Sequence, residues 1–256
     1  MKNLARIAAL VLAFCLAAGL TACGQAGYES PYTWSNLRLD GDRLTYTEDG
    51  ETLSRIGIDV SQHQGSIDWQ AVAGDGIQFA FVRMGYRGTT EGGLFEDEQW
   101  AANAEGAEAA GIELAGYFFS QATTAQEAAE EAAYAIDLAE QAGLPAGSVV
   151  AYDLESGSGT RAGMLTQQQA TECARAFCQA VEQAGYTAAL YGNANDLGLI
   201  DADVRSNRIV WLAQYATDVL AGANAEFDFT IWQYANDGSV AGIQTTVDLN
   251  LWIALK

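Results

Sequence analysis

Two acidic side chains close an apolar run near the middle of the chain. The segment VVAYDLES, residues 149–156, carries Asp153 and Glu155 one residue apart. The run is typical of a buried β-strand, in which side chains two positions apart share a face and their Cα atoms lie about 6.7 Å apart. Two carboxylates held so close in a partly desolvated site push one pKa upward, which provides an acid and a base from one chemical group. Glycoside hydrolysis requires such a pair.

An Asp-x-Glu pattern is short, and acids at a strand end often only solvate the rim. The surrounding elements favour the catalytic interpretation. Short apolar runs alternate with helical patterns at residues 95–110, 125–142 and 167–184, which indicates a parallel α/β sheet closed into a barrel. Connections beyond residue 191 are shorter and poorer in helix. The predicted strands are 57–60, 79–83, 114–119, 149–154, 188–191, 209–213, 230–234 and 247–251.

Other predicted strands also carry acids. Asp59 closes the first strand and Asp248 lies in the last, which neighbours the first when a barrel closes. In α/β barrels the chemistry takes place at the carboxyl ends of the strands. We therefore expect Asp59, Asp153, Glu155 and Asp248 to meet at one mouth.

Composition narrows the function further. The chain has 256 residues, 50% of them hydrophobic, which suits one large catalytic domain. Its net charge of −21 argues against a nucleic-acid partner. His63 is the only histidine, which excludes a histidine-rich zinc site. The four carboxylates leave an oxygen-ligated calcium or magnesium site as an alternative, but glycoside hydrolysis requires no metal. We predict no cofactor.

The amino-terminal region is typical of an exported protein. Lys2 and Arg6 precede an apolar stretch too short to span a membrane, which is the layout of a signal peptide over residues 1–22. Leu-Thr-Ala-Cys resembles a bacterial lipobox, which implies a lipid on Cys23. Residues 23–33 form a predicted tether and 34–55 a small β-meander with hairpin signals at Asp40-Gly41 and Asp49-Gly50. The catalytic barrel is predicted over residues 56–256.

Two cysteines remain besides Cys15 in the predicted signal peptide and Cys23 at the predicted lipid site. Cys173 and Cys178 fall in the helical pattern 167–184, where five residues of rise separate their Cα atoms by about 7.5 Å along the axis. This distance is too great for a disulfide. We interpret both as small core residues or inert thiols.

Ordered blocks over residues 57–252 resemble the glycoside hydrolase family 25 lysozymes, which are N-acetylmuramidases. The blocks are GIDVSQHQGSIDW (57–69), FAFVRMGYRG (79–88), AGYFFSQA (115–122), VVAYDLES, LYGN (190–193), WLAQY (211–215), IWQY (231–234) and VDLN (247–250). The resemblance implies an irregular, flattened (β/α) TIM-like barrel. It also implies cleavage of the β-1,4 bond between N-acetylmuramic acid and N-acetylglucosamine in peptidoglycan.

The resemblance also assigns roles to the acids. Glu155 would be the general acid/base, while Asp59 and Asp248 would complete the acidic cluster. Asp153 would stabilise the positive charge at the anomeric carbon, either directly or by orienting the acetamido group of the substrate. Both routes remain open at this stage, because spacing in sequence fixes Cα atoms and not oxygens.

Aromatic and amide side chains near strand ends complete the predicted site. We predict substrate contacts for Tyr117, Tyr191 and Gln233, while Trp211 is compatible with either substrate contact or core packing. His63 is expected to pack in its loop rather than bind sugar, and the loop 157–163 is a candidate for movement. The chain departs from the family pattern at Phe118 and at residues 62–64, which bears on substrate contacts.

Two functions are compatible with the sequence. The first is a muramidase tethered to the outer face of the bacterial cell membrane by its lipid, acting as a monomer on peptidoglycan glycan strands. The second is a catalytically silent lipoprotein that only binds wall glycan. The presence of all four carboxylates favours the first.

Overall fold

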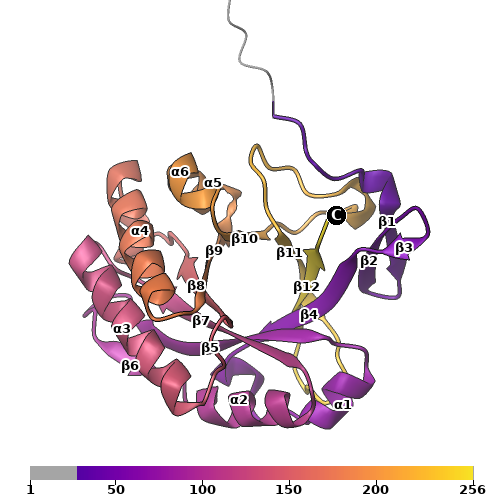
Figure 1. The fold of residues 1–256 in the computed structure, drawn as a ribbon, viewed down its shortest axis with the longest axis horizontal. Helices are drawn as coiled ribbons and strands as arrows, with labels where there is room; N and C mark the ends of the chain where they lie inside the picture. Colours follow the sequence, from indigo (N-terminus) through magenta and orange to yellow (C-terminus); the bar gives the residue numbers. More distant parts are fainter. Residues whose placement is uncertain (1–27, 256) are drawn as a thin grey trace, which may run out of the picture.

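The computed structural model describes residues 28–255, so the predicted signal peptide and Cys23 lie outside the described residues. In this part of the chain eight strands close into a barrel (Figure 1). The order around the ring is β4, β5, β7, β8, β9, β10, β11 and β12, and pairing of β12 with β4 closes it. The predicted α/β barrel with a small N-terminal sheet is thereby confirmed.

The strand bounds agree closely with the predicted ones. The strand 149–154 is observed unchanged, and most others extend by one to a few residues. The barrel strands are β4 (Ser54–Val60), β5 (Phe79–Arg87), β7 (Glu113–Ser120), β8 (Val149–Leu154), β9 (Thr187–Asn193), β10 (Ile209–Ala213), β11 (Ile231–Gly238) and β12 (Val247–Ile253).

Helices cover the first half of the barrel more completely than the second (Figure 1). Thr124 and Thr166 cap α3 and α4, each by accepting a backbone N–H in the first turn. The α-helices are α1 (Trp69–Gly74), α2 (Trp100–Ala109), α3 (Ala125–Gln141), α4 (Gln167–Gln183), α5 (Ala194–Gly198) and α6 (Ala202–Arg205). Short 3-10 turns are η1 (Trp34–Asn36), η2 (Gln62–Gln64), η3 (Ala162–Met164) and η4 (Val219–Ala221).

Two predicted features were wrong in detail. The helix predicted from residue 95 begins at Trp100, because Phe95 lies in a short strand, β6 (Leu94–Glu96), that pairs antiparallel with β5. Phe95 stacks there on Tyr86, with ring centroids 5.3 Å apart. The sheet is also not parallel throughout, since β12 runs antiparallel to both neighbours. Segment 239–246 holds no helix and is too short for a parallel crossover.

The barrel interior holds its own apolar cluster. Phe81 and Trp211 stack with ring centroids 4.1 Å apart, and Val149 and Ala151 belong to the same cluster. Because side chains alternate along a strand, Asp153 points into the interior as Val149 and Ala151 do. The alternate positions pack outward against the helices in a second, larger cluster.

A three-stranded antiparallel sheet precedes the barrel. It comprises β1 (Leu37–Asp40), β2 (Arg43–Glu48) and β3 (Glu51–Thr52), in that order. Asp49 and Gly50 form the second turn with φ of 50° and 81°, the left-handed pair that a two-residue type I′ hairpin requires. The first turn lies one residue later than predicted, because Asp40 pairs with Arg43.

This sheet packs against the outside of β4 and β12, where no described helix covers the barrel (Figure 1). Leu44 and Tyr46 are fully buried. The Tyr234 hydroxyl accepts from the Leu44 N–H and donates to the Asp42 carbonyl at 2.9 Å. Tyr32, in the predicted tether, is also buried and donates to the Phe229 carbonyl. The meander and the end of the tether therefore share the barrel's core.

Removing the side chain of Leu44 is expected to destabilise the protein substantially. Leu44→Ala removes a fully buried leucine, which costs about 2–5 kcal/mol. Leu39 is its register partner and is 44% exposed, so Leu39→Ala should change stability by less than about 0.5 kcal/mol. Urea unfolding of both variants measures the difference. Equal, small effects would mean that the meander does not share the barrel's core.

Candidate active site

A cavity of about 540 Å³ lies at the mouth of the barrel. All four predicted carboxylates line it: Asp59, Asp153, Glu155 and Asp248. A second cavity of about 510 Å³ shares Glu155 and Asp248 with the first and is otherwise lined by residues such as Tyr191 and Tyr215. The two cavities therefore adjoin along Glu155 and Asp248, and we refer to the pair of cavities as the groove.

Asp59 and Asp248 face each other across the closing strand pair. They are register partners, with Asp59 near the carboxyl end of β4 and Asp248 near the start of the antiparallel β12. Because β12 runs antiparallel to β4, its start brings Asp248 to the edge of the barrel where β4 ends. Burial and the neighbouring Asp248 carboxylate raise the pKa of Asp59 well above its ordinary value, and burial also raises the pKa of Asp248. The two groups titrate as a pair.

Asp153 is a buried acid near the carboxyl end of β8. It is 2% exposed, and its Oδ1 atom has no hydrogen-bond partner among the described residues. Burial, with the charges of Glu155 and Asp59, raises its pKa well above the ordinary value, while Arg83 opposes the shift. The residue lines the first cavity, but this oxygen is itself shielded from solvent, so it acts on a ligand there through its charge.

Glu155 lies just beyond the end of β8 at the rim. Its side chain is exposed, yet it lines both cavities rather than facing away from the mouth. The protein atoms around the carboxylate still desolvate it partly and raise its pKa, and the charges of Asp196 and Asp248 raise it further. A carboxyl group that keeps its proton longer than usual, and that a substrate can reach, is suited to act as a general acid.

Gln233 lies in β11, and its predicted contact with substrate stays a prediction. It is completely buried, and its amide donates to Asp59 Oδ2 at 2.8 Å and to Asp248 Oδ2 at 3.4 Å. Its carbonyl oxygen accepts from the hydroxyls of Tyr191 and Tyr215 at 2.8 and 2.6 Å. Both ends of the Gln233 amide are therefore occupied by protein, and the side chain links the Asp59–Asp248 pair to Tyr191 and Tyr215.

Sequence reasoning missed a second amide beneath the acids. Asn250 is completely buried and donates to Asp59 Oδ2 at 2.7 Å. Its oxygen accepts from the indole N–H of Trp211 at 2.7 Å, and Trp211 is 1% exposed. Trp211 is therefore a core residue that orients Asn250. The position of Asn250, two residues after Asp248 on an alternating strand, was the signal that could have revealed it.

The predicted aromatic contacts occupy separate cavities. Tyr117 is half-buried and lines the first cavity, where its ring meets Trp211 edge-on at 6.1 Å. Tyr191 lines the second cavity, where its hydroxyl bonds Gln233. His63 is exposed at the rim of the first cavity, in η2. Both tyrosines can therefore meet a ligand in the groove.

Arg83 is a further cavity residue that sequence reasoning missed. Its Nε donates to Asp97 Oδ2 at 2.6 Å, and the Asp97 side chain is fully buried. The charge of the guanidinium opposes the rise in pKa of both Asp153 and Glu155. The arginine stands within the block 79–88 quoted above, so its charge at a strand end was the available signal.

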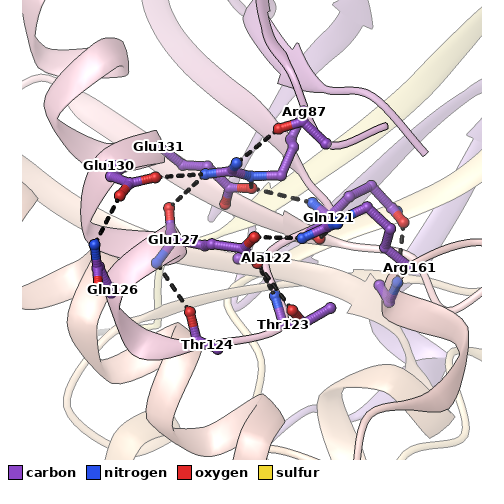
Figure 2. Close-up of polar contacts among 12 residues, drawn as sticks. Arg87, Gln121, Ala122, Thr123, Thr124, Gln126, Glu127, Glu130, Glu131 and Arg161 are labelled. Atoms are coloured by element: carbon purple, nitrogen blue, oxygen red, sulfur yellow. Dashed lines mark hydrogen bonds and ion pairs between the residues drawn. The ribbon is translucent and has the colours of Figure 1, made fainter. Parts of the chain in front are cut away.

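The loop that follows Glu155 is anchored to neighbouring loops. Arg161 donates from its backbone N–H to Thr89 and from Nε to the Gln121 carbonyl, both at 3.1 Å, and pairs with Glu127. Figure 2 shows this pairing side by side with the Arg87 contacts. On the other side, Ser156 donates to Asp196. These contacts anchor the loop 157–163 near both of its ends.

Cys173 and Cys178 are free and buried in α4. Burial raises the pKa of each thiol to about 12, so neither forms a reactive thiolate near neutral pH. Within residues 28–255, no group of three or more His, Cys, Asp or Glu side chains is arranged to hold a metal ion. No helix in the same range has the length and apolar character needed to cross a membrane.

The raised pKa of Asp153 predicts a pH-dependent stability. The folded protein loses stability while pH rises from the ordinary pKa of aspartate to the raised pKa of Asp153. In that interval the loss is about 1.4 kcal/mol per pH unit. Asp153→Asn removes the charge, so the variant should gain stability relative to wild type between pH 4 and pH 8. Thermal unfolding at both pH values tests this. A difference between variant and wild type that does not grow with pH would contradict the raised pKa.

Fold and site together define a class of protein: an α/β barrel with a carboxylate-lined cavity at the carboxyl ends of its strands, the arrangement that carboxylate-dependent glycoside hydrolysis uses. Comparison with known proteins makes this specific. The model of the glycosyl hydrolases family 25 matches residues 58–243. The chain belongs to this family and is thus a glycoside hydrolase.

Two relatives of this chain are named lysozymes. Lysozyme M1 of Streptomyces globisporus is 26% identical over 207 residues, covering 78% of this chain and 68% of that protein. The autolytic lysozyme of Clostridium acetobutylicum is 24% identical over 194 residues, covering 76% and 54%.

Solved structures share the fold. The modular autolysin LytC from Streptococcus pneumoniae gives a TM-score of 0.68 at 22% identity, covering 85% of this chain and 52% of that one. A family 25 glycosyl hydrolase from Bacillus anthracis gives 0.65 at 20% identity, covering 83% and 94%. The chain spans about half the length of the Clostridium lysozyme and of LytC.

Proposed function

We propose that the protein is a peptidoglycan hydrolase of the muramidase type, which cleaves the β-1,4 bond between N-acetylmuramic acid and N-acetylglucosamine. One observation carries the proposal: two cavities adjoin along Glu155 and Asp248, with the buried acids confined to the first. A glycan strand lying along this groove places one sugar in each cavity and the bond between them over Glu155.

In this arrangement Glu155 donates its proton to the glycosidic oxygen and later accepts a proton from water. Asp153, buried in the first cavity with a free oxygen, stabilises the positive charge that develops at the anomeric carbon. It does so directly or by orienting the acetamido oxygen of the sugar. Asp59 and Asp248 hold the sugar and tune the charge of the cavity, while Gln233 and Asn250 keep Asp59 in place.

The nature of the released fragments tests the proposal. Purified protein is incubated with peptidoglycan sacculi, the new reducing ends are reduced with borohydride, and the products are analysed by mass spectrometry. We expect reduced N-acetylmuramic acid at the new ends. Reduced N-acetylglucosamine would indicate a glucosaminidase instead. Binding to sacculi with no fragment release would support a catalytically silent glycan-binding protein.

We further propose that the protein is exported and held at the outer face of the membrane by a lipid on Cys23, acting there as a monomer. The layout of residues 1–22 supports export, and the Leu-Thr-Ala-Cys sequence supports the lipid on Cys23. Cys23→Ala is expected to move the protein from the membrane fraction of the producing cell to the soluble or unprocessed fraction. Unchanged membrane association of that variant would contradict lipidation at Cys23.

A further inference from the structure

Arg83 is the single lysine or arginine side chain lining the catalytic cavity in the described part of the chain. The adjoining cavity is lined by neither residue type. Four carboxylates surround the first cavity, so its field favours cations and repels anions. A fixed guanidinium in this setting creates one local position where an anionic or carbonyl oxygen can bind.

The guanidinium is held in place from one side only. Its Nε atom donates to the buried carboxylate of Asp97 at 2.6 Å, and its Cζ atom lies 5.3 Å from the centre of the Tyr86 ring. Asp97 is itself fixed by the backbone N–H groups of Gln62 and Gln99, at 3.1 and 2.9 Å. Among the described residues, neither Nη1 nor Nη2 of Arg83 has a hydrogen-bond partner. These two groups form a planar, pre-oriented donor pair.

The chemistry of the substrate indicates which sugar meets this donor pair. This step rests on the proposed function. A muramidase forms its positive charge at the anomeric carbon of N-acetylmuramic acid, and Asp59 and Asp153 line only the first cavity. The muramyl unit therefore occupies the cavity that contains Arg83. This sugar differs from N-acetylglucosamine by a 3-O-lactyl ether, whose carboxyl group is free in stripped glycan and is an amide carbonyl where a stem peptide is attached.

We propose that Arg83 is a specificity-determining residue that donates hydrogen bonds from Nη1 and Nη2 to the lactyl carboxyl oxygens of the muramyl unit. The surrounding acids disfavour any other placement of a carboxylate in the cavity. Asp97 acts through Arg83 as a positioning residue. The cavity thereby selects muramyl over glucosaminyl units, most strongly when the lactyl carboxylate is free.

Binding to an inactive protein separates recognition from catalysis. The full chain carrying Glu155→Gln is titrated calorimetrically with three tetrasaccharides: alternating glycan with free lactyl carboxylates, the same glycan bearing stem peptides, and chitotetraose. Adding Arg83→Met should weaken binding of the free-carboxylate glycan by about 10–100-fold, the usual range for a hydrogen bond to a charged group. The peptide-bearing glycan should lose about 3–10-fold, and chitotetraose less than about 2-fold.

Two further variants isolate the cause. Arg175→Met removes an exposed arginine that pairs with Asp203 on the surface, and it should leave all three affinities unchanged. Arg83→Lys keeps a cation beside Asp97, so it should fold even if Arg83→Met does not. Thermal unfolding of both variants checks that they are folded. A single ammonium group cannot hold Asp97 and also present a planar donor pair. The Arg83→Lys variant should therefore lose most of the preference for the free-carboxylate glycan.

The outcomes are distinguishable. An affinity loss confined to muramyl ligands and ordered as above supports recognition by Arg83. Equal losses for all three ligands, or no loss, overturn it and leave Arg83 acting only on the protonation of the acids. Fragment release by the wild-type chain is measured in parallel. If wild type releases no muramyl-ended fragment, the proposed function fails, and the assignment of Arg83 fails with it.

Discussion

Glu155→Gln is expected to lower the rate of peptidoglycan cleavage by about 10²–10⁴-fold, the usual contribution of a positioned general acid or base. Glutamine keeps the shape of the side chain but cannot donate a proton to the leaving oxygen. Glu155 is exposed at the division between the two cavities, so the change should not disturb the fold. Release of soluble fragments from sacculi, followed over time, measures the loss.

A matched control is available on the barrel's outer surface. Glu140 is an exposed glutamate on α3, and Glu140→Gln should keep the wild-type rate. Binding of glycan to Glu155→Gln should also persist, because the substitution removes chemistry rather than shape. A variant at Glu155 that retains more than about a tenth of the wild-type rate would exclude this residue as the general acid.

Arg87→Met is expected to destabilise the protein by about 3–5 kcal/mol, because it leaves the buried charge of Glu131 without its partner. Arg87 is 4% exposed and Glu131 is completely buried, with 2.7 Å between Nε and Oε1. The same guanidinium donates to the carbonyls of Gly92 and Glu127, both at 2.8 Å, and Figure 2 shows Arg87 beside Glu127 and Glu131. Urea unfolding at pH 7 measures the loss.

The dependence of this loss on pH identifies its cause. Burial already raises the pKa of Glu131 in the presence of Arg87, and removal of Arg87 should raise it further. The penalty of Arg87→Met should therefore shrink as pH falls and Glu131 takes up a proton. Arg87→Met combined with Glu131→Leu should recover much of the lost stability, since no unpaired charge remains. A double variant as unstable as the sum of the single ones would contradict the ion-pair explanation.

Local pattern was enough to predict most of the fold. Period-two alternation and apolar runs located the strands, and the 149–154 strand was predicted to the residue. The same pattern placed Asp153 on the inner face, because side-chain direction along a strand depends only on position. It failed at residue 95, where Phe95 pairs and stacks on Tyr86 in β6 instead of starting a helix. That contact lies outside any local window.

For the candidate site too, the sequence determined one part and the tertiary structure the other. The sequence by itself determined which acids exist and which strands carry them. This was sufficient to predict that the acids meet at one mouth of the barrel, and all four line one cavity there: Asp59, Asp153, Glu155 and Asp248. Only the tertiary structure decided what surrounds them. Gln233 proved to be a buried support with both ends occupied, and Asn250 and Arg83 emerged as partners of the acids.

The physical reason is the range over which each property is set. The sequence gives the type of each side chain, and the position of a residue along its strand determines the face that its side chain occupies. Hydrogen-bond partners, burial and pKa depend on side chains brought together by barrel closure, as when β12 carries Asp248 and Asn250 against Asp59 of β4. Those partners are distant in sequence, and closure of the ring alone makes them neighbours.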